Sequence, residues 1–191
     1  MPSPTTNCKV DRRIIKTKKL LKQVMLQLMD EKPLDHITIS LLCEYAQINR
    51  NTFYYHYANI EELLDDMIQD NLKSLNELST GITDFYKSQS IYAIYDFVFC
   101  NKTLYTTLLL KNMNVRFFSA LRKQNKNNVL PALISFNPNI SQNKIDLVSS
   151  FVSDTFLSTF LRWLSLGYEK APEDEAQLLI SLLEHGLLGT I

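Results

Sequence analysis

A short segment, residues 49–57, concentrates side chains that could bind a polyanion such as duplex DNA. It begins with Asn49, Arg50, Asn51 and Thr52 and continues with aromatic residues and a histidine. Guanidinium and amide groups can form paired hydrogen bonds with base edges in the major groove, and hydroxyl groups can donate to phosphate oxygens. The chemistry that this segment favours is therefore recognition of nucleic acid rather than catalysis.

The aromatic part of the same segment divides into two faces if it is helical. Tyr54, Tyr55 and His56 would offer hydroxyl and imidazole groups to phosphates and ring faces to thymine methyl groups. Phe53 and Tyr57 are four residues apart and would face inward, holding the helix on its module. A segment that packs its aromatics in a core is the alternative, but the arginine and the polar tips argue against complete burial.

Two short helices joined by a tight turn are needed to position these side chains. Thr38 is suited to cap a helix that begins at Ile39, and Asn49 is suited to cap a second helix over 50–55. The second helix of such a pair can lie in the major groove while the first crosses the backbone. Apolar residues at three- and four-residue steps predict a preceding helix over about 11–29.

The rest of the chain is also predicted to be helical. Apolar spacing and break residues indicate helices at about 60–79, 84–100, 102–111, 114–136, 141–167 and 173–188. Four glycines and six prolines leave little turn material for a many-stranded sandwich or barrel. The expected fold class is all-α, with an N-terminal three-helix module and a larger C-terminal helical domain.

Charge is distributed unevenly although 20 basic residues balance 20 acidic ones. Residues 1–57 contain nine Lys or Arg against five Asp or Glu, a net charge of +4, so the remainder carries −4. A basic N-terminal third on an acidic chain favours contact with a polyanion, and a solvated helix face explains it equally well.

Other kinds of site are not indicated. Neither glycine-rich phosphate motif is present, and the three cysteines are widely spaced without a CxxC pair. His36, His56 and His185 do not cluster, so no metal site is expected, and no catalytic residue or cofactor is predicted. The polar N-terminus lacks a secretory apolar region and no stretch is long enough to span a bilayer, so a cytoplasmic protein without a membrane partner is expected.

The segment Thr38 to Met67 resembles the DNA-binding domain of the TetR family of transcriptional regulators. The match covers about residues 10–70, and residues 157–183 are similar to the C-terminal domain of Firmicutes members, including regulators of dihydroxyacetone kinase genes. The matching positions, from the start of the second helix to the start of the fourth, are Thr38, Ala46, Asn49, Thr52, Phe53, Tyr54, His56, Tyr57, Glu62 and Leu63.

The resemblance implies which residues meet DNA. Thr38 would anchor a phosphate at the N-terminus of the second helix, where free N–H groups also favour anions, and Arg50 and Asn51 would reach bases. The further expected contacts to the backbone or to base edges, from the third helix and an N-terminal arm, are Asn49, Thr52, Tyr54, Tyr55, His56, Arg12, Arg13 and Lys16.

Two positions depart from the family pattern. Most members have glycine at the position of Gln47, where a helix ends with positive φ, and glutamine is tolerated there at some cost. Most have a phosphate-binding lysine at the position of Ile60, so one contact of the family set is missing. We expect weaker DNA binding or compensation by the basic N-terminal segment.

The same resemblance implies a DNA-binding domain over 1–57, a connecting fourth helix over about 60–79 and an effector-binding and dimerisation domain over 80–191. A filled aromatic core is the alternative to an effector cavity, whose candidate lining residues are Tyr95, Phe99, Phe118, Phe156 and Trp163. The last two helices would form a four-helix dimer interface, although a monomer's core would look similar, and its candidate residues are Leu178, Leu179, Leu182, Leu183 and Leu187.

The leading functional hypothesis is a homodimeric, ligand-responsive transcriptional regulator that binds a palindromic operator through its third helix. Repression is the usual mode of the family, while the dihydroxyacetone-type relatives include activators, so the sign of regulation stays open. Gln47 and Ile60 motivate an alternative, a co-regulator or sensor that binds a small molecule or partner protein and has lost specific DNA binding. A small helical enzyme has no residue in its favour.

Overall fold

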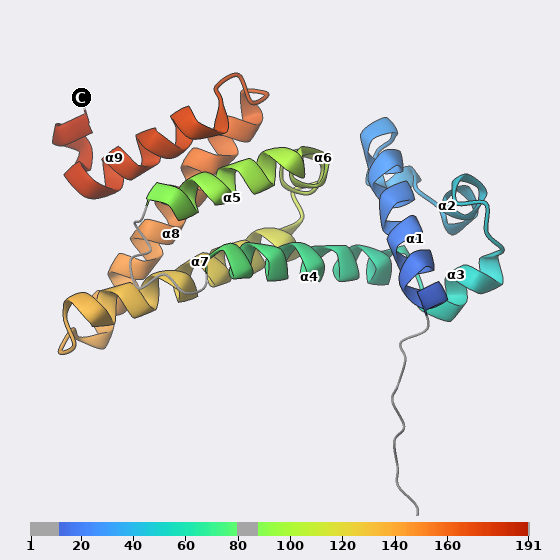
Figure 1. Cartoon of the computed structure of the whole chain (residues 1–191), viewed down its shortest axis with the longest axis horizontal. Helices are drawn as coiled ribbons and strands as arrows, with labels where there is room; N and C mark the ends of the chain where they lie inside the picture. Colours follow the sequence, from blue (N-terminus) through green and yellow to red (C-terminus); the bar gives the residue numbers. More distant parts are fainter. Residues whose placement is uncertain (1–11, 80–87, 191) are drawn as a thin grey trace, which may run out of the picture. The chain divides into compact units, whose positions relative to one another are not determined.

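The computed structural model describes residues 12–79 and 88–190, and every regular element in these two ranges is a helix (Figure 1). The chain divides into two compact units, residues 1–67 and 68–191. The division falls inside α4 (Ile60–Ser79), the helix that the sequence predicts as the connector. The predicted all-α class is therefore confirmed for the described residues.

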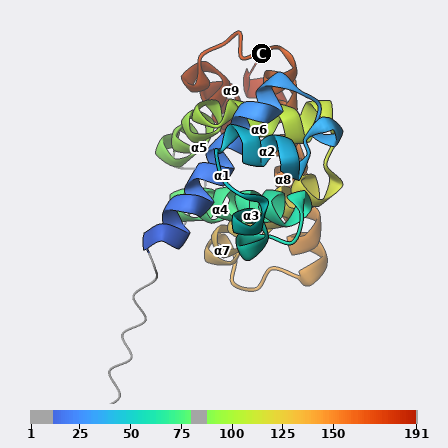
Figure 2. The same cartoon turned by 90° about the vertical axis from the view of Figure 1, so that its right-hand side faces the viewer.

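The first unit is built from three helices and the beginning of α4, which Figure 2 labels. Its other elements are α1 (Arg12–Glu31), the 3-10 turn η1 (Leu34–His36), α2 (Ile39–Tyr45) and α3 (Arg50–His56). The apolar stripe of α1 is buried, and it packs with α2, α3 and α4 around Leu42, Phe53 and Leu63, all of which are excluded from solvent. A seven-residue helix is too short to be stable alone, so this packing is what keeps α3 folded.

Polar side chains fix where the short helices begin. Thr38 Oγ1 accepts a hydrogen bond from the Leu41 amide at 3.2 Å, and Asn49 Oδ1 accepts one from the Asn51 amide at 2.9 Å. Asn59 satisfies the first turn of α4 in the same way. Each cap satisfies an amide that lacks a partner inside its helix. The two caps predicted at Thr38 and Asn49 are confirmed.

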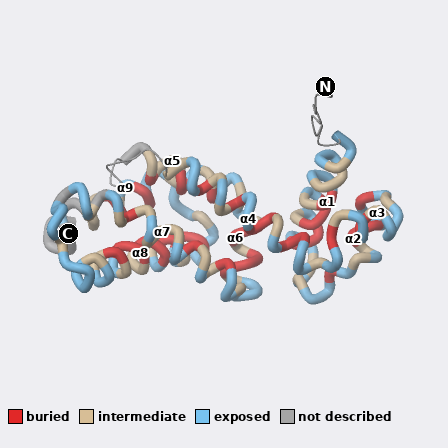
Figure 3. Tube along the Cα trace, turned by 90° about the horizontal axis from the view of Figure 1, so that it is seen from below, coloured by how far each residue is buried: buried red, intermediate tan, exposed pale blue. Residues whose placement is uncertain are grey.

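The second unit packs α5 against α9 and α7 against α8. Figure 3 shows the buried residues along these helices, and the largest enclosed side chains are Trp163, Tyr95, Tyr105 and Phe117. Besides the C-terminal part of α4, its elements are α5 (Ser88–Cys100), α6 (Lys102–Tyr105), the π-helical turn η2 (Thr106–Lys111), α7 (Val115–Phe136), α8 (Gln142–Ser165) and α9 (Pro172–Thr190).

One predicted helix differs from the structure, and the starts of two others lie outside the described residues. The helix predicted over 102–111 is divided between α6 and the π-helical turn η2, after which Met113 adopts a left-handed backbone with φ 43°. The predicted start of the preceding helix at residue 84 lies outside the described residues, as does the start of the first at residue 11. Of the described helices, none combines the length and the apolar character that crossing a bilayer requires.

Candidate functional site

Helix α3 presents one polar, solvent-exposed side and one buried side. Arg50 and Asn51 are exposed at its first turn, and Tyr54 and Tyr55 expose 55% and 74% of their surface. On the opposite side Phe53 is completely enclosed, and Tyr57, directly after the helix, is almost completely enclosed. The predicted orientation of Phe53 and Tyr57 is therefore confirmed, and the side chains predicted to read bases are accessible to a ligand.

Small residues in α2 and in the turn that follows it allow α3 to pack closely. Cys43 and Ala46 are buried at the end of α2, and the Ile48 amide donates to the Cys43 carbonyl oxygen at 3.0 Å. Burial raises the pKa of the Cys43 thiol, against the effect of the Arg50 charge, so the thiol stays protonated at neutral pH. Cys43 is therefore uncharged and does not neutralise the positive charge of Arg50.

Gln47 closes α2 in the left-handed region, with φ 52°. This is the backbone conformation for which the family uses glycine, and an L side chain there costs on the order of 1 kcal/mol. The chain still forms the turn, because the Gln47 amide donates to the Glu44 carbonyl oxygen at 3.1 Å. The departure from glycine therefore leaves the geometry of the helix-turn-helix in place.

The remaining predicted DNA-contacting residues all lie in the first unit. Arg12, Arg13 and Lys16 are exposed near the start of α1, and Thr52 is half-buried on α3. Thr38 is exposed, and since its oxygen accepts from α2, its hydroxyl proton can still be donated to a phosphate.

His56 is half-buried at the end of α3. Burial lowers its pKa below the usual value of 6.5, and the nearby charge of Lys18 lowers it further. His56 is therefore a neutral hydrogen-bonding group at neutral pH, not a cation. Ile60, at the first residue of α4, is also half-buried and has no polar atom with which to replace the lysine of the family pattern.

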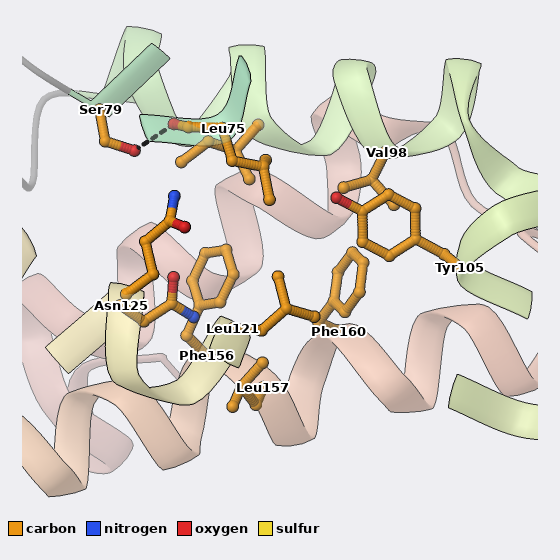
Figure 4. Close-up of a pocket in the computed structure, with 11 residues that line it drawn as sticks. Leu75, Ser79, Val98, Tyr105, Leu121, Asn125, Phe156, Leu157 and Phe160 are labelled. Atoms are coloured by element: carbon orange, nitrogen blue, oxygen red, sulfur yellow. Dashed lines mark hydrogen bonds between the residues drawn. The ribbon is translucent and has the colours of Figure 1, made fainter. Parts of the chain in front are cut away.

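A small cavity of about 20 Å³, partly open to solvent, lies in the second unit between α4, α5, α7 and α8 (Figure 4). This volume holds about one water molecule. Its residues are mostly apolar, and the polar ones are Ser79, Tyr105, Gln124 and Asn125. In this conformation this cavity is therefore too small for an effector larger than a water molecule.

The five predicted effector-lining residues are dispersed. Phe156 borders the cavity, whereas Tyr95 and Trp163 are packed against each other in the core with ring centroids 5.1 Å apart. Phe118 lines a surface groove between α7 and α8, and Phe99 is partly exposed beside Trp163. Aromatic packing thus occupies the space that the sequence analysis assigned to a ligand at Tyr95 and Trp163.

The leucines predicted for the dimer interface are also divided. Leu179 is buried in the protomer's own core, while Leu178, Leu182 and Leu183 are half-buried. The side chain of Leu187 lies outside the described residues.

Two exposed apolar residues on α8 were not predicted from the sequence. Leu147 and Phe151 expose 71% and 67% of their surface and lie one helical turn apart. Their spacing of four residues was a usable signal, but it was obscured by the stronger buried stripe of the same helix.

Acidic, histidine and cysteine side chains do not converge on a metal site. Within residues 12–79 and 88–190, no three of them come close enough together to hold an ion.

Similarity to family models covers both units. Residues 25–67 match the model for bacterial regulatory proteins of the tetR family, and residues 88–185 match a model for a transcriptional regulator C-terminal region. An uncharacterized HTH-type transcriptional regulator, YxbF of Bacillus subtilis (strain 168), is 47% identical over 62 residues, or 31% of this chain. This chain spans only 16% of the length of that relative.

Solved structures share the fold. A TetR transcriptional regulator from Streptococcus agalactiae 2603V is 25% identical, with a TM-score of 0.70, over 92% of this chain and 97% of that one. The dihydroxyacetone kinase operon activator DhaS is 19% identical, with a TM-score of 0.67, over 88% of this chain and 94% of that one. Both structures therefore share the overall fold of this chain.

Proposed function

Because the chain belongs to the TetR family of transcriptional regulators, we propose that it binds a palindromic operator as a homodimer through α3. The observation that carries the proposal is the outward side of this helix, where Arg50, Asn51, Tyr54 and Tyr55 are exposed together. Phe53 holds the opposite side in the core, so the polar tips are presented by a fixed helix rather than by a loop.

The proposed contacts follow from the position of each side chain on the unit. Arg50 and Asn51, at the N-terminal end of α3, reach base edges, where their planar groups can form paired hydrogen bonds. The tyrosines, Thr52 and neutral His56 bind phosphates or base edges. Thr38 donates to a phosphate at the start of α2, and the exposed cations of α1 add backbone contacts.

Fluorescence anisotropy at several salt concentrations tests the proposal. An operator-bearing duplex should bind with an affinity that falls steeply with salt, because each phosphate contact releases a counterion and contributes about one unit of log–log slope. A protein that binds a small molecule or a partner but prefers no DNA sequence would instead support the co-regulator hypothesis.

A second copy of the chain is the proposed occupant of the apolar surface on α8. Leu147 and Phe151 are exposed on this long helix. Covering large apolar side chains with a partner removes them from water and stabilises the complex. Leu183 of α9 packs with Val148 of α8 on a small buried cluster, so α9 lies beside the end of α8 that carries the exposed pair. Continuity between the two helices supports a four-helix dimer interface.

Phe151→Asp is expected to dissociate the dimer, because it places a charge where the partner's apolar side chains would pack. Sedimentation velocity should show a monomer, and operator affinity should fall because only one half-site is held at a time. Val115→Asp, at a similarly exposed apolar residue on α7, is the matched control and should remain dimeric. If the Phe151→Asp protein remains dimeric, α8 is not part of the dimer interface.

The cavity beside Phe156 is the proposed effector site. It must expand to admit a ligand, and movement of Phe156 and Phe160 would provide the space. Within residues 12–79 and 88–190 no charged residue borders it, and an unpaired charge in apolar surroundings is costly, so the effector class is a neutral, mainly apolar molecule. Thermal denaturation with a panel of neutral and charged compounds tests this class, since a ligand of the native state raises the midpoint.

A further inference from the structure

One carboxylate oxygen in the first unit gathers three donors, two from α1 and one from the residue that follows α3. The Tyr57 hydroxyl donates to Asp66 Oδ2 at 2.6 Å, and the Nζ atoms of Lys22 and Lys18 lie 2.9 and 3.3 Å from the same oxygen. The Lys18 ammonium also lies 5.0 Å from the centroid of the Tyr57 ring. This Asp66 cluster (Asp66, Tyr57, Lys18 and Lys22) therefore joins α1, the end of α3 and α4.

The cluster is partly shielded from water. The side chains of Asp66 and Lys22 are 29% and 19% exposed, so their interaction is less screened than that of a surface pair. Partial burial raises the pKa of Asp66, but the hydrogen bonds from Tyr57 and the two lysines outweigh it, and the pKa lies below its usual 3.8. Asp66 is therefore ionised at neutral pH, with two cations beside it.

Tyr57 gives the cluster its connection to the DNA-reading surface. It directly follows the last residue of α3, and its backbone amide donates to the Phe53 carbonyl oxygen at 2.9 Å. Its ring is enclosed and its hydroxyl ends on Asp66, so the C-terminal end of the recognition helix is fastened to α4. Base reading depends on this placement, because paired hydrogen bonds are lost when a side chain shifts by a fraction of their length.

The same carboxylate neutralises cations that could otherwise attract phosphates. Lys18 and Lys22 belong to the basic N-terminal segment, and such charges bind any DNA sequence equally. We propose that Asp66 is a specificity-determining residue, which holds the end of α3 in its reading position and withholds two α1 lysines from nonspecific phosphate contact. This inference rests on the proposed operator binding, and it deepens it.

The variant Asp66→Asn tests both parts of this proposal, the placement of α3 and the neutralisation of the two lysines. The affinity for the selected operator should fall by about tenfold, while the affinity for an unrelated duplex of equal length should rise several-fold. The log–log salt slope of nonspecific binding should steepen by up to about one unit for each lysine released. The decisive readout is the specificity ratio, the operator affinity divided by the affinity for the unrelated duplex. A purely electrostatic role of Asp66 would raise both affinities, and a purely structural role would lower both.

Two further variants keep the test sharp. Tyr57→Phe removes only the hydroxyl, so it should lower operator affinity without raising nonspecific affinity, and it replaces Asp66→Asn if that variant fails to fold. Glu61→Gln makes the same charge change at an exposed residue of the first turn of α4 and should leave the specificity ratio unchanged. A ratio equal in Asp66→Asn and Glu61→Gln would overturn the inference.

Hydrogen exchange in the free protein gives a readout that needs no operator. Amides of residues 50–57 should exchange faster in Asp66→Asn than in wild type, because the end of α3 is no longer fastened. Unchanged exchange there would contradict the positioning role. Faster exchange in a protein that selects no DNA sequence would refute operator binding, and the specificity claim with it, while leaving the contact itself established.

Discussion

Replacing Arg50 with alanine is expected to lower operator affinity by about 5- to 150-fold without unfolding the protein. A guanidinium paired with a base edge contributes about 1–3 kcal/mol of discrimination, which corresponds to that range. Arg50 is exposed at the first turn of α3, and in the described residues it makes no hydrogen bond or ion pair that the fold would lose. Anisotropy titration against operator and unrelated duplexes measures the change, and circular dichroism checks the fold.

Tyr54→Ala extends the same test along the exposed side of α3 and should also lower operator affinity. Lys111→Ala, which deletes one exposed positive charge in the second unit, is the control for a general loss of charge. It should leave operator affinity close to that of wild type. Normal operator affinity in both Arg50→Ala and Tyr54→Ala would refute the assignment of α3 as the recognition helix.

Trp163→Ala is expected to cost the second unit about 3–5 kcal/mol of unfolding free energy, the range for removing a large buried aromatic. The ring is almost completely enclosed and contacts Tyr95 and Tyr168 at centroid distances of 5.1 and 4.9 Å. Its Nε1 donates to the Lys170 carbonyl oxygen at 3.0 Å, so the turn between α8 and α9 loses a partner too. Urea denaturation followed by circular dichroism measures the loss.

Trp163→Phe is the companion variant for this residue. It keeps an aromatic ring in the core but removes the indole N–H, so its cost should be clearly smaller than that of Trp163→Ala. If the alanine variant loses less than about 1 kcal/mol of unfolding free energy, the neighbouring side chains must rearrange to fill the space of the indole. The core around Trp163 would then be more adaptable than its packing indicates.

Local signals in the sequence predicted the first unit well. The helix starts at Ile39 and Arg50 follow from the capping side chains of Thr38 and Asn49, which act within three residues. The two sides of α3 follow from helical periodicity alone. The Asp66 cluster was not predicted, because Lys18 and Asp66 are 48 residues apart and only the folded chain brings them together.

Features of the second unit depended on packing that periodicity does not determine. An apolar run predicts a helix over 102–111, but it does not distinguish an α-helical turn from the π-helical turn at Thr106–Lys111. Tyr95 and Trp163 are in the core rather than at a cavity because aromatic neighbours from different helices enclose them. Leu179 is buried for a similar reason, since α5 packs against α9.

Selection of bound sequences from random DNA by the whole 191-residue chain tests the central claim most directly. If two copies of α3 read a duplex, the enriched sequences should converge on an inverted repeat whose half-sites lie on one face of the DNA, about one helical turn apart. Arg50→Ala should fail to enrich that repeat. A folded, dimeric wild-type protein that enriches no inverted repeat would contradict the account.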